Sequence, residues 1–293
     1  FVLIQFHNDP RELFVPDSGY GISHEQWEAL GDRLGLNDPL WKQYVDWVGR
    51  TLRGDLGVSL ARDRAVTELL RGKVGATVQL AIGSWVFAIG LGIPMGVLAA
   101  VKRGSGWDYF GRGLAIVGQA APPFVTALVA IWIFAVWLEW LPAGGRSPEF
   151  DWKEYLLPCM ALGWGAAASL MRLTRSSMLE VLDSEYIRLA RAKGVNWNWV
   201  IYKHALRNAL IVPVTSALLT FSGWLNGALV VEIVFSWPGI GYEALYRAVN
   251  DNDFPLLLGT VFIFILIYLV FATIADIAYT IIDPRVRLGD STE

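Results

Sequence analysis

Residues that could carry nucleotide or metal chemistry are scarce in this sequence. It contains no Gly-x-x-x-x-Gly-Lys-Ser/Thr segment, the loop that holds nucleotide phosphates in many ATPases. His7, His24 and His204 form no His-Glu-x-x-His pair, which argues against a zinc protease or a serine–histidine hydrolase within the membrane. Cys159 is the only cysteine, so the chain has no disulfide framework and no multi-thiolate metal site of its own. The sequence predicts neither an enzyme nor a resident cofactor or metal.

Polar side chains within apolar stretches are the remaining candidates, because charge inside a bilayer is costly and is kept for a function or a partner. Asp276 lies near the end of its stretch, where pairing with another helix or an interfacial Arg is favoured over a transport role. Glu139 and Glu232 are expected near outer ends, with Glu139 at the interface. Gln119 and Asn226 are the deeper polar residues.

The elements that hold these residues are long and apolar. Apolar residues make up 54% of the 293 positions and charged residues 17%. The net charge of −3 gives no support for a nucleic-acid partner. About 20 helical residues cross the hydrocarbon layer, so we expect an all-α protein that crosses the lipid bilayer several times. The five full spans predicted are 74–101, 112–140, 156–176, 209–231 and 257–282.

The rest of the chain is assigned around these spans. Residues 1–6 are expected to be the end of a truncated first span, which would make a sixth transmembrane helix. Residues 7–73 are too charged to span and are expected to form an extracytoplasmic helical loop. Residues 74–282 form the predicted transmembrane domain, with a cytoplasmic loop at 177–208, and residues 283–293 form a cytoplasmic tail.

Helix signals occur within the 7–73 loop. Ser23 and Gln26 have capping-box spacing, and Asp38 before Pro39 is typical of an N-cap followed by proline at the first helical position. The apolar residues that follow share one helical face; they are Trp41, Tyr44, Val45, Val48 and Leu52. This helix either packs on the rest of the protein or lies at the membrane interface, and the sequence leaves both open.

Lys and Arg in the short connections indicate the orientation, because they gather on the cytoplasmic side. The predicted cytoplasmic set is Lys102, Arg103, Arg112, Arg172, Arg175, Arg188, Arg191, Lys193, Lys203, Arg207, Arg285 and Arg287. The opposite short loops hold Arg146, Lys153 and Arg247. Loops longer than about 60 residues largely escape the rule, so the charges of residues 7–73 do not conflict with an outer location.

Proline and glycine mark special points in the spans. Pro94 and the pair Pro122-Pro123 interrupt two of them and permit kinks. Such kinks belong either to a gate or to ordinary helix packing, and the second explanation is the commoner. Gly90, Gly92 and Gly96 have the small-xxx-small spacing that is typical of close helix packing.

The stretch from Ser184 to Asn208 is too long for a simple connection. Apolar residues recur in it at helical spacing, at Tyr186, Leu189 and Ala190 and then at Trp199, Val200 and Tyr202. The pattern predicts two short amphipathic helices joined at Gly194, whose missing Cβ permits a left-handed turn after a helix. These helices either dock a partner or pack under their own membrane domain.

The loop also carries a family resemblance. The run Glu-Tyr-Ile-Arg-Leu-Ala-Arg-Ala-Lys-Gly-Val at 185–195, followed by 204–213, resembles the EAA loop of the B-type permeases of dipeptide, oligopeptide and nickel ABC importers. Arg188-Leu189-Ala190 replaces Glu-Ala-Ala, as is usual in the peptide branch. Further matches, in order, are Asn8-Asp9-Pro10, 34–40, 54–59, 232–241 and Asp283-Pro284-Arg285, with Asn8 where the family usually has Gly.

The resemblance implies a type I ABC importer-like permease fold in a bacterial or archaeal cytoplasmic (inner) membrane. The implied partners are a second permease, two cytoplasmic ATPase subunits that bind ATP and Mg, an extracytoplasmic substrate-binding protein and a peptide substrate. The helix at 185–193 would be the coupling helix that sits in a groove of the ATPase. Its implied contact residues are Glu185, Tyr186, Arg188, Ala190, Arg191, Ala192, Lys193 and Gly194.

The expected function is transport by alternating access, driven by ATP binding and hydrolysis in partner subunits. The substrate is left open between a dipeptide, a longer peptide, nickel and another small solute, because much of that choice rests with the binding protein. A nucleotide-independent secondary transporter or channel is the rival, but its usual inverted repeats and deep ionisable residues are missing. A membrane-bound enzyme is disfavoured because no catalytic constellation is present.

The charge asymmetry predicts that residues 7–73, 141–155 and 232–256 are extracytoplasmic. In intact cells, cysteines placed at Ser18 or Ser236 should therefore react with a membrane-impermeant thiol reagent, whereas a cysteine at Asn196 should react only after permeabilisation. Labelling at Asn196 with protection at the other two positions would reverse the assigned orientation.

Overall fold

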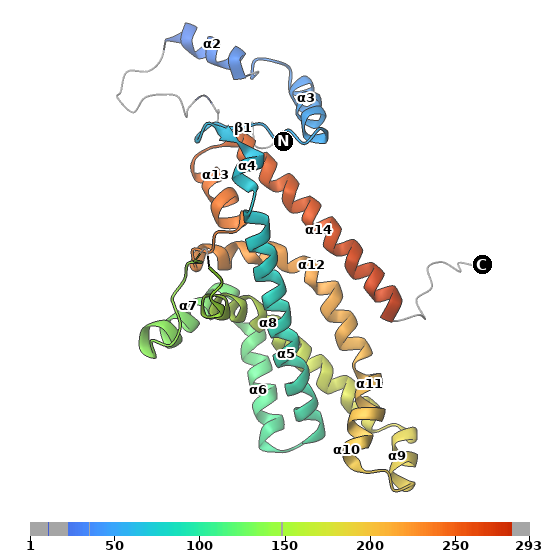
Figure 1. Ribbon diagram of the computed structural model, residues 1–293. Helices are drawn as coiled ribbons and strands as arrows, with labels where there is room; N and C mark the ends of the chain where they lie inside the picture. Colours follow the sequence, from blue (N-terminus) through green and yellow to red (C-terminus); the bar gives the residue numbers. More distant parts are fainter. Residues whose placement is uncertain (1–10, 12–22, 35, 148, 283–293) are drawn as a thin grey trace, which may run out of the picture. The chain divides into compact units, whose positions relative to one another are not determined.

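The computed structural model describes residues 11, 23–34, 36–147 and 149–282, and helices predominate among them (Figure 1). The chain divides into two compact units, one made of Phe1–Ala76 and Pro238–Leu266 and the other of Thr77–Trp237 and Ile267–Glu293. The predicted end of a first span at 1–6, the Asn8-Asp9-Pro10 match and the predicted tail at 283–293 lie outside the described residues.

The first unit contains most of the predicted extracytoplasmic loop. α2 (His24–Leu34) begins directly after Ser23, as its capping signal predicted. α3 (Leu40–Leu52) begins one residue later than predicted, with Pro39 rather than Asp38 at the N-cap, and Lys42 Nζ lies 2.9 Å from the Asp38 carboxylate. The other elements are β1 (Val58–Ser59), its antiparallel partner β2 (Arg64–Ala65), α4 (Val66–Leu70), η4 (Gly241–Tyr246), α13 (Arg247–Asn250) and the start of α14 (Phe254–Ile282).

Asp253 is a fully buried carboxylate that joins the hairpin of this unit to the start of α14. It accepts hydrogen bonds from Ser59 Oγ and from the backbone N–H groups of Leu60 at 3.2 Å and Leu256 at 3.2 Å. A buried carboxylate needs several such donors to offset its lost hydration. No local sequence pattern signals this contact, because Ser59 and Asp253 are 194 positions apart.

The second unit is an assembly of long helices with a compact loop at one end (Figure 1). Its long elements are α5 (Lys73–Val101), α6 (Gly106–Ala120), α7 (Pro123–Ala130), the π-helical segment η2 (Ile131–Trp137), α8 (Trp152–Leu182) and α12 (Ile211–Val234). The loop between α8 and α12 contains α9 (Glu185–Ala192), α10 (Trp197–Trp199), the π-helical segment η3 (Val200–Ala205) and α11 (Leu206–Ala209).

Most of the predicted spans correspond to single helices. Among the described residues, Val66–Val101, Trp152–Leu182 and Phe254–Ala278 are each long and apolar enough to cross a membrane. The exception is the predicted continuous span at 112–140. In its place, Gly106–Ala120 and Pro123–Trp137 form a pair of helices bent by 113°, which would count as a fourth span if both belong to one crossing.

Proline explains the break in that pair. Ala121 and Pro122 are extended, and Pro123 begins α7. Proline lacks the N–H that a helix interior needs, and it also disfavours helical backbone in the residue before it. Pro94, by contrast, lies inside α5, which continues through it as one helix. The sequence predicted that a kink could form at both places but not that only the Pro122-Pro123 pair would separate two helices.

Glycines on α5 allow its backbone to approach that of α8. A Cβ on Gly92 would lie 2.6 Å from the carbonyl oxygen of Ala167, and one on Gly96 would lie 2.6 Å from that of Met171. The predicted close packing is therefore confirmed for these two residues. Among the residues that the structure describes, no heavy atom of a neighbouring element lies within 4 Å of the Cβ position of Gly90, so Gly90 takes no part in the contact.

A buried ion pair joins the start of α6 to α8. The Asp108 carboxylate accepts hydrogen bonds from Arg175 Nε at 2.7 Å and Arg175 Nη2 at 3.0 Å, and from the backbone N–H of Gly104 at 2.9 Å. Arg112 Nε lies 3.4 Å from the same carboxylate. A bidentate ion pair of this kind fixes the register of α6 and α8 and also neutralises a buried charge.

The glycine contact predicts that Gly96→Leu destabilises the protein by about 1–3 kcal/mol, because the added side chain overpacks the boundary between α5 and α8. The matched change Gly90→Leu adds the same side chain to the same helix where space is open, so it should cost much less. Thermal unfolding of the purified variants in detergent tests this. Equal losses in both variants would contradict a specific contact at Gly96.

Candidate functional site

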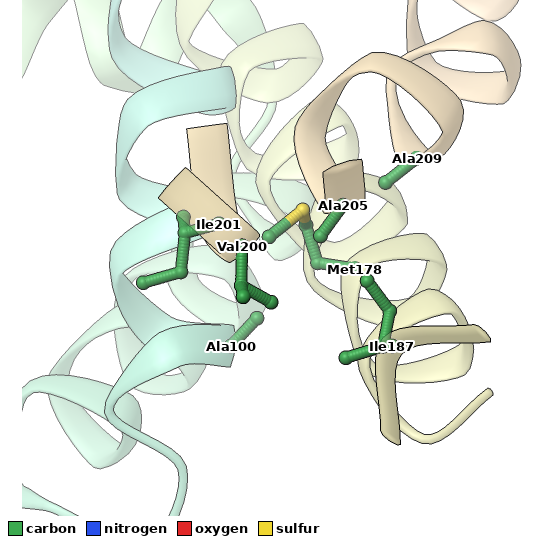
Figure 2. Close-up of a cluster of buried hydrophobic side chains, with 7 residues drawn as sticks. All are labelled: Ala100, Met178, Ile187, Val200, Ile201, Ala205 and Ala209. Carbon is green, nitrogen blue, oxygen red and sulfur yellow. The ribbon is translucent and has the colours of Figure 1, made fainter. Parts of the chain in front are cut away.

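The loop between α8 and α12 is the candidate site because it presents a helix, α9, that is anchored on one side and exposed on the other. Ile187 anchors it, with only 1% of its surface exposed. Ile187 belongs to a buried cluster (Figure 2) that also contains Ala100, Met178, Val200, Ile201, Ala205 and Ala209. These residues come from the ends of α5 and α8 and from η3 and α11, so α9 is attached to several elements at once.

The outer face of α9 has no cover within the described residues. Leu189 is 62% exposed, although it is apolar. Glu185, Tyr186, Arg188, Arg191, Ala192 and Lys193, which sequence analysis assigned to a partner contact, are also exposed. The structure thus brings these residues together on one accessible helix with an apolar side chain among charged ones.

Ala190 differs from the other residues in this set. It is partly buried and packs against the cluster around Ile187. The two residues are three positions apart, so they share one face of the helix. The sequence analysis placed Ala190 in the contact with a partner, but in this structure its side chain is turned toward the protein's own core.

The end of α9 is closed by a glycine turn. Gly194 has φ of +76°, which confirms the left-handed conformation predicted for it. The N–H of Val195 donates to the carbonyl of Ala190 at 3.2 Å, and the N–H of Gly194 donates to the carbonyl of Arg191 at 2.9 Å. This pair of bonds is the Schellman motif, which satisfies carbonyls that the helix end would leave unpaired.

The second half of the loop is tied back to α9. Asn208 Nδ2 donates to Tyr186 Oη at 3.0 Å, and the Arg191 guanidinium lies 4.9 Å from the centre of the Trp197 ring. Asn196 caps α10 by accepting a hydrogen bond from the N–H of Asn198 at 2.9 Å. The predicted pair of short helices joined at Gly194 is therefore present, and its halves form a single packed piece.

The polar candidates inside the spans have separate roles. Glu232 is fully buried and accepts a hydrogen bond from Thr77 Oγ1 at 2.6 Å. Asp276 and Glu139 are exposed, and neither has an ion-pair partner among the described residues. Gln119 lines two pockets of about 300 and 480 Å³ on α6, one with Arg112 and Arg172 and one beside Pro122. The side chain of Asn226 lies outside the described part of the chain.

Comparison with known proteins agrees with this arrangement. Residues 92–288 match the model of the family described as binding-protein-dependent transport system inner membrane component. The dipeptide transport system permease protein DppB of Alkalihalophilus pseudofirmus is 40% identical over 283 residues, which cover 88% of this chain and 85% of that protein. The glutathione transport system permease protein GsiC of Escherichia coli O6:H1 is 37% identical over 260 residues, which cover 89% of this chain and 84% of the relative.

A solved structure shares the fold. An inward-facing MetNI methionine ABC transporter chain superposes with a TM-score of 0.62 at 18% identity, covering 74% of this chain and 97% of that one. The architecture is thus that of an ABC-importer permease. The chain belongs to the family of inner membrane components of binding-protein-dependent transport systems, and it is the permease component of an ABC importer.

The turn after α9 predicts a graded response to substitution at Gly194. Within the described part of the chain, no heavy atom of another residue lies within 4 Å of its Cβ position, so a substitution is expected to act mainly through the backbone. Gly194→Val should destabilise the turn by about 1–3 kcal/mol, because a β-branched residue at positive φ is strained. Gly194→Asn should be tolerated, because Asn adopts this conformation readily.

Trypsin cleavage in the 188–193 segment of the purified protein measures local opening of this turn. A loss of about 1.4 kcal/mol should speed cleavage about tenfold in the Val variant if opening is rapid, with little change in the Asn variant. Equal cleavage rates in Gly194→Val and Gly194→Asn would show that the left-handed turn does not hold α9 in place.

Proposed function

We propose that α9 is the coupling helix of this permease and that its exposed face docks into a groove of an ATPase subunit. The observation that carries the proposal is the contrast between the two faces of α9. Ile187 is buried in the permease, whereas Leu189, two residues later, is 62% exposed. An exposed apolar side chain flanked along the chain by Arg188 and Lys193 suits a groove with an apolar floor and acidic edges.

The packing beneath α9 supports a mechanical role. α8 ends at Leu182, and only Asp183 and Ser184 separate it from α9. The buried cluster adds a second connection, through Ala100 of α5 and Val200 of η3. A displacement of α9 by a closing ATPase would therefore be passed to several membrane helices together, as rigid-body alternating access requires.

The full importer proposed contains this chain, a second permease, two cytoplasmic ATPase subunits and an extracytoplasmic substrate-binding protein. The sequence has no phosphate-binding loop, which supports binding of ATP and Mg by the ATPase subunits and the absence of an ATPase site in this chain. Substrate would pass between the two permeases. Family membership removes the nucleotide-independent secondary transporter as a rival.

Peptides are the substrate class we propose. The support comes from relatives, since DppB is named for dipeptide transport and GsiC for transport of glutathione, which is itself a small peptide. Nickel or another small solute is the alternative that the resemblance to the wider family keeps open.

The docking proposal predicts opposite outcomes for two changes at one position. Leu189→Glu should abolish most substrate-stimulated ATP hydrolysis and uptake in a reconstituted complex, because it places a charge in an apolar contact. Leu189→Met retains an apolar side chain of similar volume and should behave nearly as wild type. Because Leu189 is largely exposed, both variants should keep the thermal stability of the isolated permease.

Uptake is measured with a labelled dipeptide, glutathione and nickel in parallel, so that the substrate class is tested in the same vesicles. Permease without ATPase subunits gives the background and should hydrolyse no ATP. Coupled transport at the wild-type rate in Leu189→Glu would remove α9 from the ATPase interface. Uptake of nickel alone would leave the coupling role intact and overturn the peptide assignment.

A further inference from the structure

α3, in the first unit, has three distinct faces. Successive helical residues turn by about 100°, since an α-helix has 3.6 residues per turn. Trp47 and Thr51 then lie on one face, Trp41, Val45 and Leu52 on a second, and polar residues on a third, each about a third of a turn from the next. The polar set is Lys42, Asp46 and Arg50.

The first face packs on the protein. Thr51 is only 6% exposed. The ring of Trp47 lies edge-on to that of Phe262 in α14, with 6.5 Å between the ring centres. The stretch of α14 from Phe254 to Ala278 is one of the candidate membrane spans. α3 therefore rests against the side of a helix that crosses the bilayer.

The second face is apolar and exposed. The exposed fractions are 70% for Trp41, 58% for Val45 and 79% for Leu52. Apolar residues near Phe262 on α14 are also exposed, with Val261 at 40% and Ile265 at 51%. Both helices of the Trp47–Phe262 contact therefore expose apolar side chains close to that contact, and on α14 these side chains belong to a candidate membrane span.

The position of the Trp47–Phe262 contact along α14 indicates how deep in the bilayer this contact would lie. α14 has 29 residues, or about 43 Å at 1.5 Å per residue, which matches the full thickness of a bilayer with its headgroups. Phe262 is eight residues after Phe254, so it lies about 12 Å from the start of the helix. That places the contact a few ångströms inside the hydrocarbon boundary, the depth at which interfacial helices bury their apolar side.

We propose that α3 is an interfacial helix that lies on the lipid bilayer beside α14. The face with Trp47 and Thr51 would pack against α14, and the face with Trp41, Val45 and Leu52 would enter the outer edge of the acyl chains. The face with Lys42, Asp46 and Arg50 would contact water. Trp41 suits such a site because indole rings concentrate at membrane interfaces. This inference goes beyond the transport role proposed above and does not depend on the ATPase contact.

The test compares adjacent residues on the second and third faces. In full-length permease with Cys159→Ala, a single cysteine at Val45 or Asp46 carries a nitroxide label, and the protein is reconstituted in phosphatidylcholine–phosphatidylglycerol vesicles. Collision rates with oxygen, which concentrates in the bilayer, and with a water-soluble nickel chelate are measured by paramagnetic resonance. The ratio of oxygen to nickel collisions should be at least several-fold higher at Val45 than at Asp46.

Two outcomes overturn the proposal. Nickel access at Val45 equal to that at Asp46 would place the apolar face in water. Protection of Val45 from both reagents would show that protein covers it, and repeating the measurement with the second permease would show whether that chain is the cover. A diazirine side chain at Leu52 in the unmodified background provides an independent measurement, because adducts with phospholipid support the proposal and adducts with polypeptide alone contradict it.

Discussion

The coupling role proposed for α9 depends on one apolar contact, the burial of its residue Ile187 against the rest of the second unit. An eight-residue helix is too short to be stable alone in water, so it needs tertiary packing to persist. Burying an isoleucine side chain contributes about 1.5–3 kcal/mol, and the same contact joins α9 to Ala100, Met178 and Val200. In the proposed coupling role, the contact that stabilises α9 would also transmit its displacement, so a partner that moves the exposed face would move the ends of the membrane helices.

α8 connects this contact to the rest of the second unit. The backbone carbonyls of Ala167 and Met171 in α8 lie against Gly92 and Gly96 of α5, and Arg175 of α8 pairs with the buried carboxylate of Asp108 on α6. Close backbone packing resists sliding because the dense contact leaves no room for the helices to shift, and the bidentate ion pair resists rotation because it requires a defined geometry. These restraints make α5, α6 and α8 suited to move as a body, which rigid-body alternating access needs.

The two units place apolar surface outside the core for different reasons. In the second unit, the broken pair α6 and α7 with η2 exposes large apolar residues, among them Ile116 at 71% and Trp132 at 62%. Lipid suits such a surface, because a protein surrounded by water would bury it. In the first unit, one side of α3 is apolar and exposed, and charged residues occupy another side. This pattern is typical of a helix at the membrane interface rather than of a helix that crosses the bilayer.

The sequence alone determined the class of the protein, the location of most helices, the turn at Gly194 and the family. Those properties follow from apolar run length, helical spacing and residue type, which are local. Only the tertiary structure decided that Ala190 faces inward, that Asp108 pairs with Arg175, and that Pro122 and Pro123 separate two helices while Pro94 lies within one. Each of these depends on which helix lies alongside, and neighbours in space such as Asp108 and Arg175 are 67 positions apart in the chain. A local pattern carries no information about such partners, because packing and charge neutralisation are fixed only when the helices assemble.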